Sequence, residues 1–517
     1  MSVVLVLLLA IPAIGLLALY VAPTALAARI GAAAGVVTFL VSLLLLPLFD
    51  YSSGASFQGQ VDLSWIQALD LRFHLGVDGV SLPLLLLTTL LTALCLLYSV
   101  RTAGTDGRGR AFTALLLTLE IGMVGTFESL DLLLFFIFFE LVLIPMYALI
   151  SNWGADDTHG GPTRRQSATK FILYTLLGSG LMLLGFLVIH AKTGTFDMVE
   201  LQARHGLGIS VGAQSLAFVL VGLGFAIKTP MWPLHTWLPD AHTSAPTVGS
   251  VLLAGVLLKM GTYGFIRVGA GMLPQGLHQY AVALGAFGVV GIVWGSFACL
   301  AQIRRGGDLK RLIAYSSVGH MGFTLLGIAT MTQVGLDGAL YASIAHGLIT
   351  GLLFFLVGGM KERYGSTDLY ALGRGLYGRA RRYGALVAFA AVASLGLPGL
   401  AGFWGELYVL IGADRPGPGL SVTAFHLYMG IAGLGMVLTA AYLLLVVRRV
   451  CMGTAGDPEN EAVLAHDRDL SRRELVSWLP LAALTLLAGL WPAVLLTAAD
   501  PAVHHVLGAV SAIGARR

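Results

Sequence analysis

Long apolar runs separated by short polar segments are the main feature of this sequence. The first run, residues 1–28, contains no charged side chain. Such runs are typical of membrane-spanning helices, because about 20 residues that rise 1.5 Å each cross a hydrocarbon core about 30 Å thick. The pattern predicts about 14 spans, numbered here in chain order, at residues 2–20, 30–49, 80–100, 112–129, 131–151, 168–190, 213–235, 248–268, 278–300, 310–330, 337–359, 384–412, 424–447 and 476–498.

The composition agrees with a polytopic membrane protein. Of 517 residues, 57% are hydrophobic and 11% are charged, and the mean hydropathy is +0.84. Soluble domains carry about 25% charged residues, so a soluble enzyme of this size and a disordered chain are both excluded. The net charge of +4 and the lack of a basic patch or Gly-rich phosphate loop predict no nucleic-acid or nucleotide partner. Three cysteines without CxxC spacing predict no metal or cluster.

The distribution of lysine and arginine predicts the orientation of the spans, because cytoplasmic loops retain these residues. With 14 spans, 22 of the 31 basic residues fall in loops on one side and seven fall on the other. The remaining two, Lys228 and Lys259, lie within spans. The asymmetry predicts that both termini lie on the non-cytoplasmic side.

A few ionisable side chains remain inside the predicted spans. A charge at the bilayer centre costs about 2.5–3.5 kcal/mol even on the lenient insertion scale, so these groups should face protein or water and serve an ion or proton pathway. They are Glu120, Glu140, Lys228, Lys259, His320, His346 and Glu406.

Glu140 and Lys228 are the clearest candidates for proton exchange. Glu140 has no other charge within eight residues on either side, and an interhelical ion pair that only fixes packing is the alternative. Lys228 precedes Pro230, which removes a backbone donor and should break span 7. Burial favours the neutral lysine and a nearby carboxylate favours the charged one, so their separation can switch the proton on or off.

A second break is predicted in span 12, where Gly396, Pro398 and Gly399 precede Glu406. Pro-interrupted helices in corresponding halves indicate an inverted-repeat transporter site. Spans 4–8 and 9–13 would form two inverted five-helix repeats with broken helices 7 and 12. This correspondence pairs Lys228 with Glu406, and Glu140 with His320.

Lys259, His320 and His346 extend these pairs into an acid–base row. Lys259 is expected to relay protons onward, or alternatively to neutralise Glu120 or Glu140. The histidines suit a relay because their charge changes near pH 7, although each alone is equally consistent with a hydrogen-bonded interior histidine. The row predicts proton movement through an all-α polytopic membrane protein, without indicating what drives it.

Several motifs carry a family resemblance. They are the segment from Lys228 through His235 and Asp240 to Lys259, together with Gly76–Ser81, Phe139–Met146, Asp308–His320 and Gly396–Glu406. These segments resemble the antiporter-like membrane subunits of proton-pumping NADH:quinone oxidoreductase, respiratory complex I. The longest and shortest of those subunits, and the related sodium/proton antiporter subunits, carry lysine at the Glu406 position, so glutamate indicates the remaining branch.

The resemblance implies roles for the row. Glu140 and Lys228 would be the family's glutamate–lysine pair, Lys259 its connecting lysine and Glu406 the terminal group. It also implies that proton translocation is driven by quinone reduction elsewhere in a complex of the bacterial plasma (inner) membrane. NADH, FMN, iron–sulfur clusters and quinone would lie in partner subunits and no cofactor in this chain. The expected partners are other membrane-arm subunits, including the two other antiporter-like subunits, and membrane lipids.

The expected organisation has four parts: residues 1–111 with spans 1–3, residues 112–270 and 271–450 with the two repeats, and residues 451–517 with a cytoplasmic loop and span 14. Two other functions stay open. A subunit of a multisubunit sodium/proton antiporter is one, and a structural membrane spacer whose charges only bind neighbours is the other.

Overall fold

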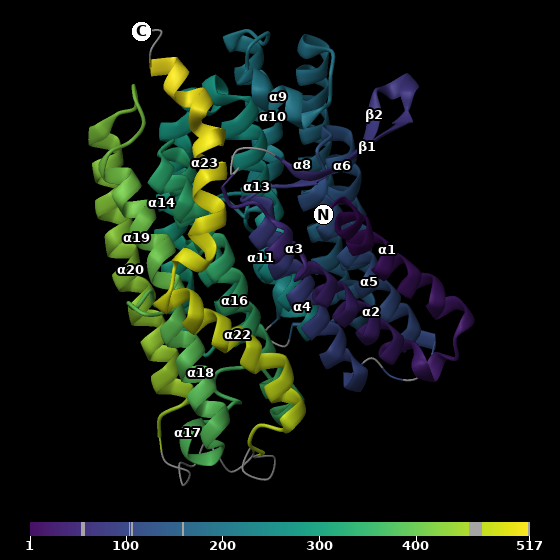
Figure 1. Cartoon of the computed structure of the whole chain (residues 1–517). Helices are drawn as coiled ribbons and strands as arrows, with labels where there is room; N and C mark the ends of the chain where they lie inside the picture. Colours follow the sequence, from purple (N-terminus) through teal and green to yellow (C-terminus); the bar gives the residue numbers. More distant parts are fainter. Residues whose placement is uncertain (53–56, 103, 105–106, 158–159, 454–467, 515–517) are drawn as a thin grey trace.

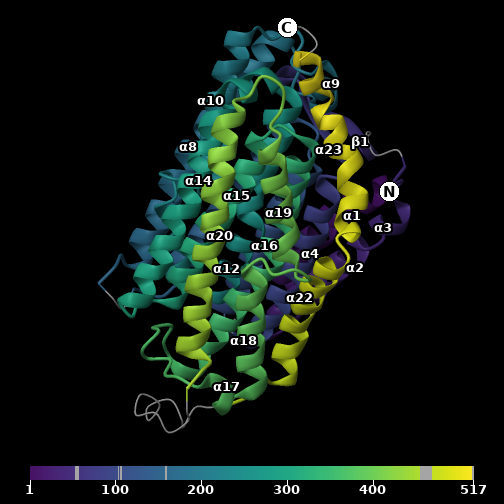
Figure 2. The same ribbon diagram turned by 90° about the vertical axis from the view of Figure 1, so that its left-hand side faces the viewer.

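The computed structural model is a bundle of long helices (Figures 1 and 2). It describes residues 1–517 except 53–56, 103, 105–106, 158–159, 454–467 and 515–517. Within the described part, 12 helices are long and apolar enough to cross a membrane, and a bent helix pair brings the number to 13. The expected helical, multi-pass membrane architecture is therefore confirmed.

The chain begins with helices that pack beside one another at one side of the bundle. Their termini match the apolar runs, and the short polar segments separate them. They are α1 (Ser2–Val21), η1 (Thr24–Leu26), α2 (Ala27–Ser42), α3 (Leu45–Leu48), α4 (Ser81–Thr102) and α5 (Gly107–Glu128).

A two-stranded sheet corrects the expectation of an all-α fold. Strands β1 (Gln58–Ile66) and β2 (Leu71–Val77) pair antiparallel around the short helix η2 (Gln67–Leu69). The strands alternate polar and apolar residues, a period-2 pattern that is too short to appear as an apolar run. The hairpin projects from the end of the bundle in Figure 1.

The middle of the chain contains one continuous long helix and several interrupted ones. Span 5 is divided at Val142 into α6 (Leu132–Leu141) and α7 (Leu143–Trp153), and span 8 contains two π-helical segments. The elements are α8 (Arg164–Thr193), α9 (Met198–Arg204), α10 (Val211–Lys228), α11 (Trp237–Ser244), α12 (Thr247–Leu252), η3 (Leu253–Leu257), α13 (Leu258–Gly264) and η4 (Phe265–Ala270).

In the next region of the chain, three long helices precede an interrupted one. The interruption separates α18 from α19, which lie one beyond the other beside α20 in Figure 2. The elements are α14 (Pro274–Arg304), α15 (Leu309–Ala329), α16 (Gln333–Tyr364), α17 (Leu376–Arg379), α18 (Arg381–Ser394), α19 (Ala401–Asp414) and α20 (Val422–Val450).

The C-terminal span, expected at residues 476–498, is bent. Two helices, α22 (Arg472–Leu490) and α23 (Ala493–Gly514), meet at an angle of 67° around Trp491 and Pro492. A proline removes a backbone donor and clashes with the preceding turn, which accounts for the break. Figure 1 shows the bend in yellow, with α23 running to the C-terminus.

Burial separates the inner helices from the outer ones. The apolar windows of Thr247–Ala270 and of α16 are completely buried, whereas those of α1, α8 and α20 are buried over only 33–39% of their residues. The outer helices present exposed leucines and valines such as Leu177 and Leu434, as lipid-facing surfaces do. The ionisable groups of the predicted row therefore lie on or against helices of the bundle interior.

Candidate functional site

Glu140 and Lys228 lie near each other but are not in hydrogen-bond contact. Glu140 is half-buried at the end of α6, and its Oε1 atom has no hydrogen-bond partner among the described residues. The same holds for Lys228 Nζ at the end of α10, where the side chain is 2% exposed. Nζ lies 4.8 Å from the centre of the Phe139 ring, and the charges of Glu140 and Lys228 are close enough to interact. The two groups therefore act on each other through their charges and not through a direct hydrogen bond.

The helix that carries Lys228 ends where the sequence predicts. Helix α10 stops at Lys228, and α11 begins only at Trp237. Pro230 follows the last helical residue and cannot donate a backbone hydrogen bond. The break leaves Thr229 buried, with a hydroxyl that has no partner among the described residues. Lys228 thus lies at the start of a non-helical segment inside the bundle. Non-helical backbone at membrane depth is tolerated only beside protein or water.

Lys259 contacts a histidine from a distant part of the chain. Its side chain is fully buried, and Nζ lies 2.6 Å from Nδ1 of His346 and 2.5 Å from the carbonyl oxygen of Ala254. Lys259 follows the π-helical segment η3, and such segments recur at functional sites. His346 lies in the part of α16 between Gly335 and Met360, which is buried throughout. The contact therefore joins the two halves of the chain at the centre of the bundle.

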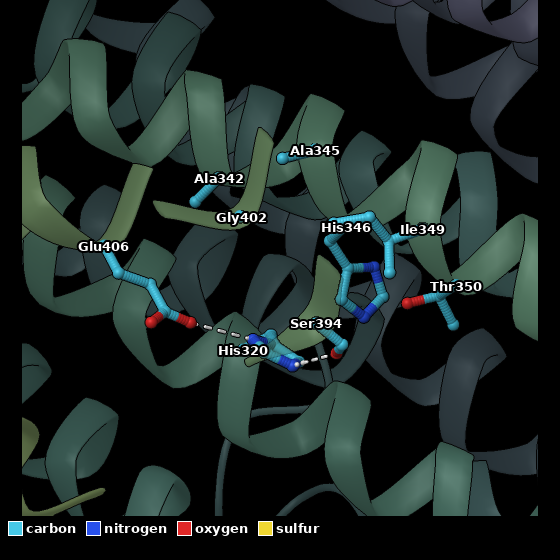
Figure 3. Close-up of a pocket in the computed structure, with 9 residues that line it drawn as sticks. All are labelled: His320, Ala342, Ala345, His346, Ile349, Thr350, Ser394, Gly402 and Glu406. Carbon is cyan, nitrogen blue, oxygen red and sulfur yellow. Dashed lines mark hydrogen bonds and ion pairs between the residues drawn. The ribbon is translucent and has the colours of Figure 1, made fainter. Parts of the chain in front are cut away.

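The row continues from His346 to Glu406 (Figure 3). The rings of His346 and His320 lie 5.6 Å apart between centres. Nδ1 of His320 lies 3.1 Å from Oε1 of Glu406, and Nε2 lies 3.0 Å from the hydroxyl of Ser394. Glu406 is 4% exposed. Both ring nitrogens of His320 are thus engaged, one by an acid and the other by a hydroxyl.

A small cavity lies between these side chains. It has a volume of about 20 Å³, and its lining residues include five with polar side chains: His320, His346, Thr350, Ser394 and Glu406. One water requires about 10–15 Å³ and two to four polar partners. Nε2 of His346 and Oε2 of Glu406 are buried without partners among the described residues. The cavity therefore has the size and the polar groups to hold one water in the row.

The break between α18 and α19 makes room for the Glu406 carboxylate. Gly396 has a φ of +77°, and a Cβ atom there would lie 2.9 Å from Oε2 of Glu406. Gly399 also adopts a positive φ, of +89°. Pro398 lies between them, outside both helices. The Gly–Pro segment identified in the sequence thus lies directly against the acid at the end of the row.

The structure separates the predicted site residues into two groups. Glu140 and Lys228 form one, and Lys259, His346, His320 and Glu406 form the second, in which the small cavity lies between the two histidines. Lys259 makes no hydrogen bond or ion pair with Glu120 or Glu140 among the described residues, so a direct neutralising contact is not formed. Glu120 is fully buried in α5, and neither carboxyl oxygen has a partner among the described residues.

Two buried groups near the row were not among the predicted site residues. His242 in α11 is fully buried, and neither ring nitrogen has a partner among the described residues. Its ring stacks on that of Phe354 at 4.5 Å. Lys310 was expected in a cytoplasmic loop, but it lies in the first turn of α15 and is 1% exposed. His242 could have been found from its position inside the motif between Asp240 and Lys259.

Arg267 is a further correction, because it was expected in a loop and is fully buried in η4. Its guanidinium donates to both carboxylate oxygens of Asp78, at 2.8 and 2.5 Å. Burial raises the pKa of Asp78, but Arg267 and the hydrogen bonds from Ser81 outweigh this effect, so the pKa lies below its usual value. The pair fixes the segment before α4 to the end of span 8.

Known proteins match this chain over most of its length. Residues 129–432 match the family described as NADH:quinone oxidoreductase/Mrp antiporter, TM. NADH-quinone oxidoreductase subunit M of Rhodobacter capsulatus is 40% identical over 484 residues, 92% of this chain and 89% of that protein. NADH-ubiquinone oxidoreductase chain 4 of Arabidopsis thaliana is 37% identical over 478 residues, 92% and 91% of the two chains.

Solved structures share the architecture. A chain of respiratory complex I from Thermus thermophilus with bound NADH gives a TM-score of 0.83 at 29% identity, covering 98% of this chain and 99% of that one. A chain of the Mrp complex from Dietzia sp. gives 0.81 at 23% identity, covering 98% of this chain and 52% of that one. At 23% identity, the similarity to the Mrp chain shows a shared fold alone.

The chain therefore belongs to the NADH:quinone oxidoreductase/Mrp antiporter family of membrane subunits. Within that family it is similar to subunit M of bacterial NADH-quinone oxidoreductases and to chain 4 of NADH-ubiquinone oxidoreductases. The family resemblance predicted from the motifs is confirmed, as is the branch indicated by Glu406.

Proposed function

We propose that this chain is a proton-translocating membrane-arm subunit of an NADH:quinone oxidoreductase and moves protons coupled to quinone reduction elsewhere in the complex. The named relatives are subunits of such enzymes. The observation that carries the proposal is the series of neighbouring titratable groups from Lys259 to Glu406, in which a cavity with room for one water lies between His346 and His320. Such groups are costly inside a membrane and are retained in proton relays.

The proposed cycle begins at Glu140 and Lys228. A change of charge in a neighbouring subunit moves Glu140 relative to Lys228. When the carboxylate moves away, the buried lysine favours its neutral form and its proton passes toward Lys259. The same carboxylate favours the charged lysine when it returns, which prepares Lys228 for another proton.

The second part of the cycle uses the continuous row. Lys259 gives its proton to Nδ1 of His346, with which it is already in contact. A water in the small cavity would carry the proton from Nε2 of His346 toward His320 and Glu406, because all three residues line that cavity. Glu406 then releases the proton on the non-cytoplasmic side.

Substitution of Lys228 by alanine in the intact complex tests the proposal. We expect the proton-to-electron ratio to fall, or turnover to fall with pumping if the steps are tightly coupled. The readouts are quinone-reductase activity and acidification of sealed vesicles. A wild-type ratio at wild-type turnover would contradict the proposed function. Glu140→Ala is expected to behave like Lys228→Ala, since each leaves the other without its partner.

The two other functions make different predictions. A sodium/proton antiporter subunit would have no redox partner, and the genes beside its own would not encode quinone-reductase subunits. A structural spacer would tolerate Glu140→Gln, which preserves shape while removing the charge. We expect Glu140→Gln to lower pumping while the complex still assembles.

We propose a count of 14 spans, obtained by adding α18 and α19 as one broken span to the 13 described above. Each has 14 residues, too few to cross alone. Both termini would then lie on the non-cytoplasmic side of a bacterial plasma (inner) membrane. Arg516 and Arg517, counted on that side, lie outside the described residues.

The proposed organisation keeps the four parts expected from the sequence. Residues 1–111 precede the repeats, residues 112–270 and 271–450 form them, and 451–517 completes the chain, with 454–467 outside the described residues. The broken pairs α10–α11 and α18–α19 would correspond, which relates Lys228 to Glu406 and Glu140 to His320.

Partner subunits would supply the redox chemistry. NADH, FMN, iron–sulfur clusters and quinone would lie there, and this chain would hold no cofactor. Its exposed apolar helices would contact lipids and other membrane-arm subunits, including two further antiporter-like ones. We expect no nucleic-acid partner.

A further inference from the structure

Ser394 is a buried hydroxyl residue that lies against the row of titratable groups. It is the last residue of α18, directly before the Gly–Pro break, and it is 4% exposed. Its hydroxyl oxygen lies 3.0 Å from Nε2 of His320. Figure 3 shows this hydroxyl on the side of His320 that faces away from Glu406. Ser394 thus contacts a member of the row without being titratable itself.

The hydrogen bond of Ser394 differs from those of other buried hydroxyls in the bundle. The hydroxyls of Thr88, Ser99 and Thr126 each donate to the carbonyl oxygen four residues earlier in the same helix. Such a bond uses the single O–H donor of the side chain. Within the described part of the chain, the hydroxyl of Ser394 bonds to His320 and to no backbone carbonyl. Its O–H is therefore available to the imidazole ring.

The acid on the other side of His320 fixes the direction of this hydrogen bond. Nδ1 of His320 lies 3.1 Å from Oε1 of Glu406. An ionised carboxylate only accepts, so Nδ1 carries the N–H while Glu406 is ionised. A neutral imidazole has one N–H, which leaves Nε2 as an acceptor for the O–H of Ser394. Ser394 therefore stabilises the tautomer of His320 whose N–H is directed at Glu406.

The same reasoning applies to His346 at the other end of the cavity. A charged lysine only donates, so Nδ1 of His346 accepts from Nζ of Lys259, 2.6 Å away. Nε2 of His346 then carries the N–H. This atom has no partner among the described residues, and His346 lines the small cavity together with Ser394. One water in the cavity can accept from Nε2 and donate to the hydroxyl oxygen of Ser394.

We propose that Ser394 is a proton-transfer residue that links the cavity water to His320 and gives the row a single direction. With Lys259 charged and Glu406 ionised, every donor between them is directed toward the acid. During the transfer, each intermediate group takes one proton at its acceptor atom and gives one from its donor atom. Lys259 thus loses one proton and Glu406 gains one, and the hydrogen bonds of the row must turn before the next transfer. The inference rests on the proposed function.

Two substitutions that are similar in shape separate the hydroxyl of Ser394 from its packing. Ser394→Thr keeps the hydroxyl and adds a methyl group, whereas Ser394→Val adds the same bulk and removes the hydroxyl. We expect the intact complex with Ser394→Thr to pump near the wild-type rate. We expect Ser394→Val to pump about tenfold less or to turn over correspondingly more slowly. Equal pumping in the two variants, whether high or low, would overturn the proposal.

A matched control removes a buried hydroxyl that lies elsewhere. Thr38 in α2 is fully buried, and its hydroxyl donates to the carbonyl oxygen of Ala34. Thr38→Val should therefore pump like wild type. Thermal unfolding of each purified complex shows whether the variants at position 394 are equally stable.

The solvent isotope effect gives a readout that a packing defect would not change. A proton must cross the gap left by Ser394→Val without the hydroxyl, so its transfer should become rate-limiting. We expect the ratio of initial pumping rates in H2O and D2O to be larger in Ser394→Val than in wild type or Ser394→Thr. An unchanged ratio in Ser394→Val would overturn the proposal.

The outcome is distinguishable from failure of the proposed function. If Lys228→Ala pumps normally, the proposed function fails. If Lys228→Ala stops pumping while Ser394→Thr and Ser394→Val pump equally, the proposed function stands and the role of Ser394 is overturned.

Discussion

Nζ of Lys259 lies 2.6 Å from Nδ1 of His346, although the two residues are 87 positions apart. This contact joins the span that follows the first helix break to α16, and the apolar windows of both are completely buried. From His346 the row reaches His320 and then Glu406, beside the second break. The proposed pumping route rests on this geometry from Lys259 onward, because each of these groups lies beside the next one or beside a cavity that can hold one water.

Proton pumping should require a titratable side chain at position 406. We expect Glu406→Gln to lower pumping about tenfold or more, because an amide cannot take the proton that His320 delivers. Glu406→Lys should retain more pumping than Glu406→Gln, since lysine titrates. Dye-reported acidification at matched electron-transfer rates measures both. Glu200→Gln, at a half-exposed side chain of α9, is the control. Equal pumping in wild type and Glu406→Gln would exclude Glu406 as a proton carrier.

Gly396 should be required for the position of Glu406. Gly396→Ala places a Cβ atom at a φ of +77° and 2.9 Å from the carboxylate. We expect a loss of about 1–2 kcal/mol in the free energy of unfolding, together with reduced pumping. Thermal unfolding of the purified complex measures the first effect. Gly180→Ala, in α8 with open space around it, should cause neither. Unchanged stability and pumping in Gly396→Ala would show that the backbone there adapts freely.

The buried pair of Asp78 and Arg267 should be sensitive to removal of one partner. Arg267→Ala leaves a buried carboxylate without its cation, and we expect a destabilisation of about 3–5 kcal/mol. Adding Asp78→Asn should restore part of this loss. Because the pKa of Asp78 is lowered, the pair should remain stabilising until the pH falls through that low value. Additive losses in the double variant would contradict a direct interaction between the two residues.

Asp131 should make the stability of the protein depend on pH in the opposite direction to Asp78. Burial raises its pKa from 3.8 to about 6, against the hydrogen bonds from Leu134, Arg72 and Leu133. Between these values the folded state binds more protons than the unfolded one, so stability falls as the pH rises, by up to about 3 kcal/mol. Asp131→Asn can still cap α6 and should lose less stability between pH 4 and 7 than wild type. Parallel pH profiles would contradict the raised pKa.

The sequence indicated many of the features that define the candidate site. Buried charges in apolar runs identified Glu140, Lys228 and Glu406, since such groups are rare in membranes. Proline and glycine located both helix breaks, because their backbone effects are local. These inferences depend on short segments, which hydropathy and residue type describe well.

Contacts between distant segments could not be obtained in this way. The Lys259–His346 contact depends on how α13 packs against α16, which no local pattern encodes. Lys310 and Arg267 were assigned to loops because they lie at the ends of apolar runs, where one helical turn separates solvent from interior. The β1–β2 hairpin was missed because its period-2 pattern is short.

The most direct test of the account is the proton-to-electron ratio of the intact complex carrying Lys259→Met. This substitution keeps the length of the side chain and removes the group that contacts His346. The account predicts a ratio below that of wild type, or a proportional loss of turnover. A wild-type ratio at wild-type turnover would contradict it.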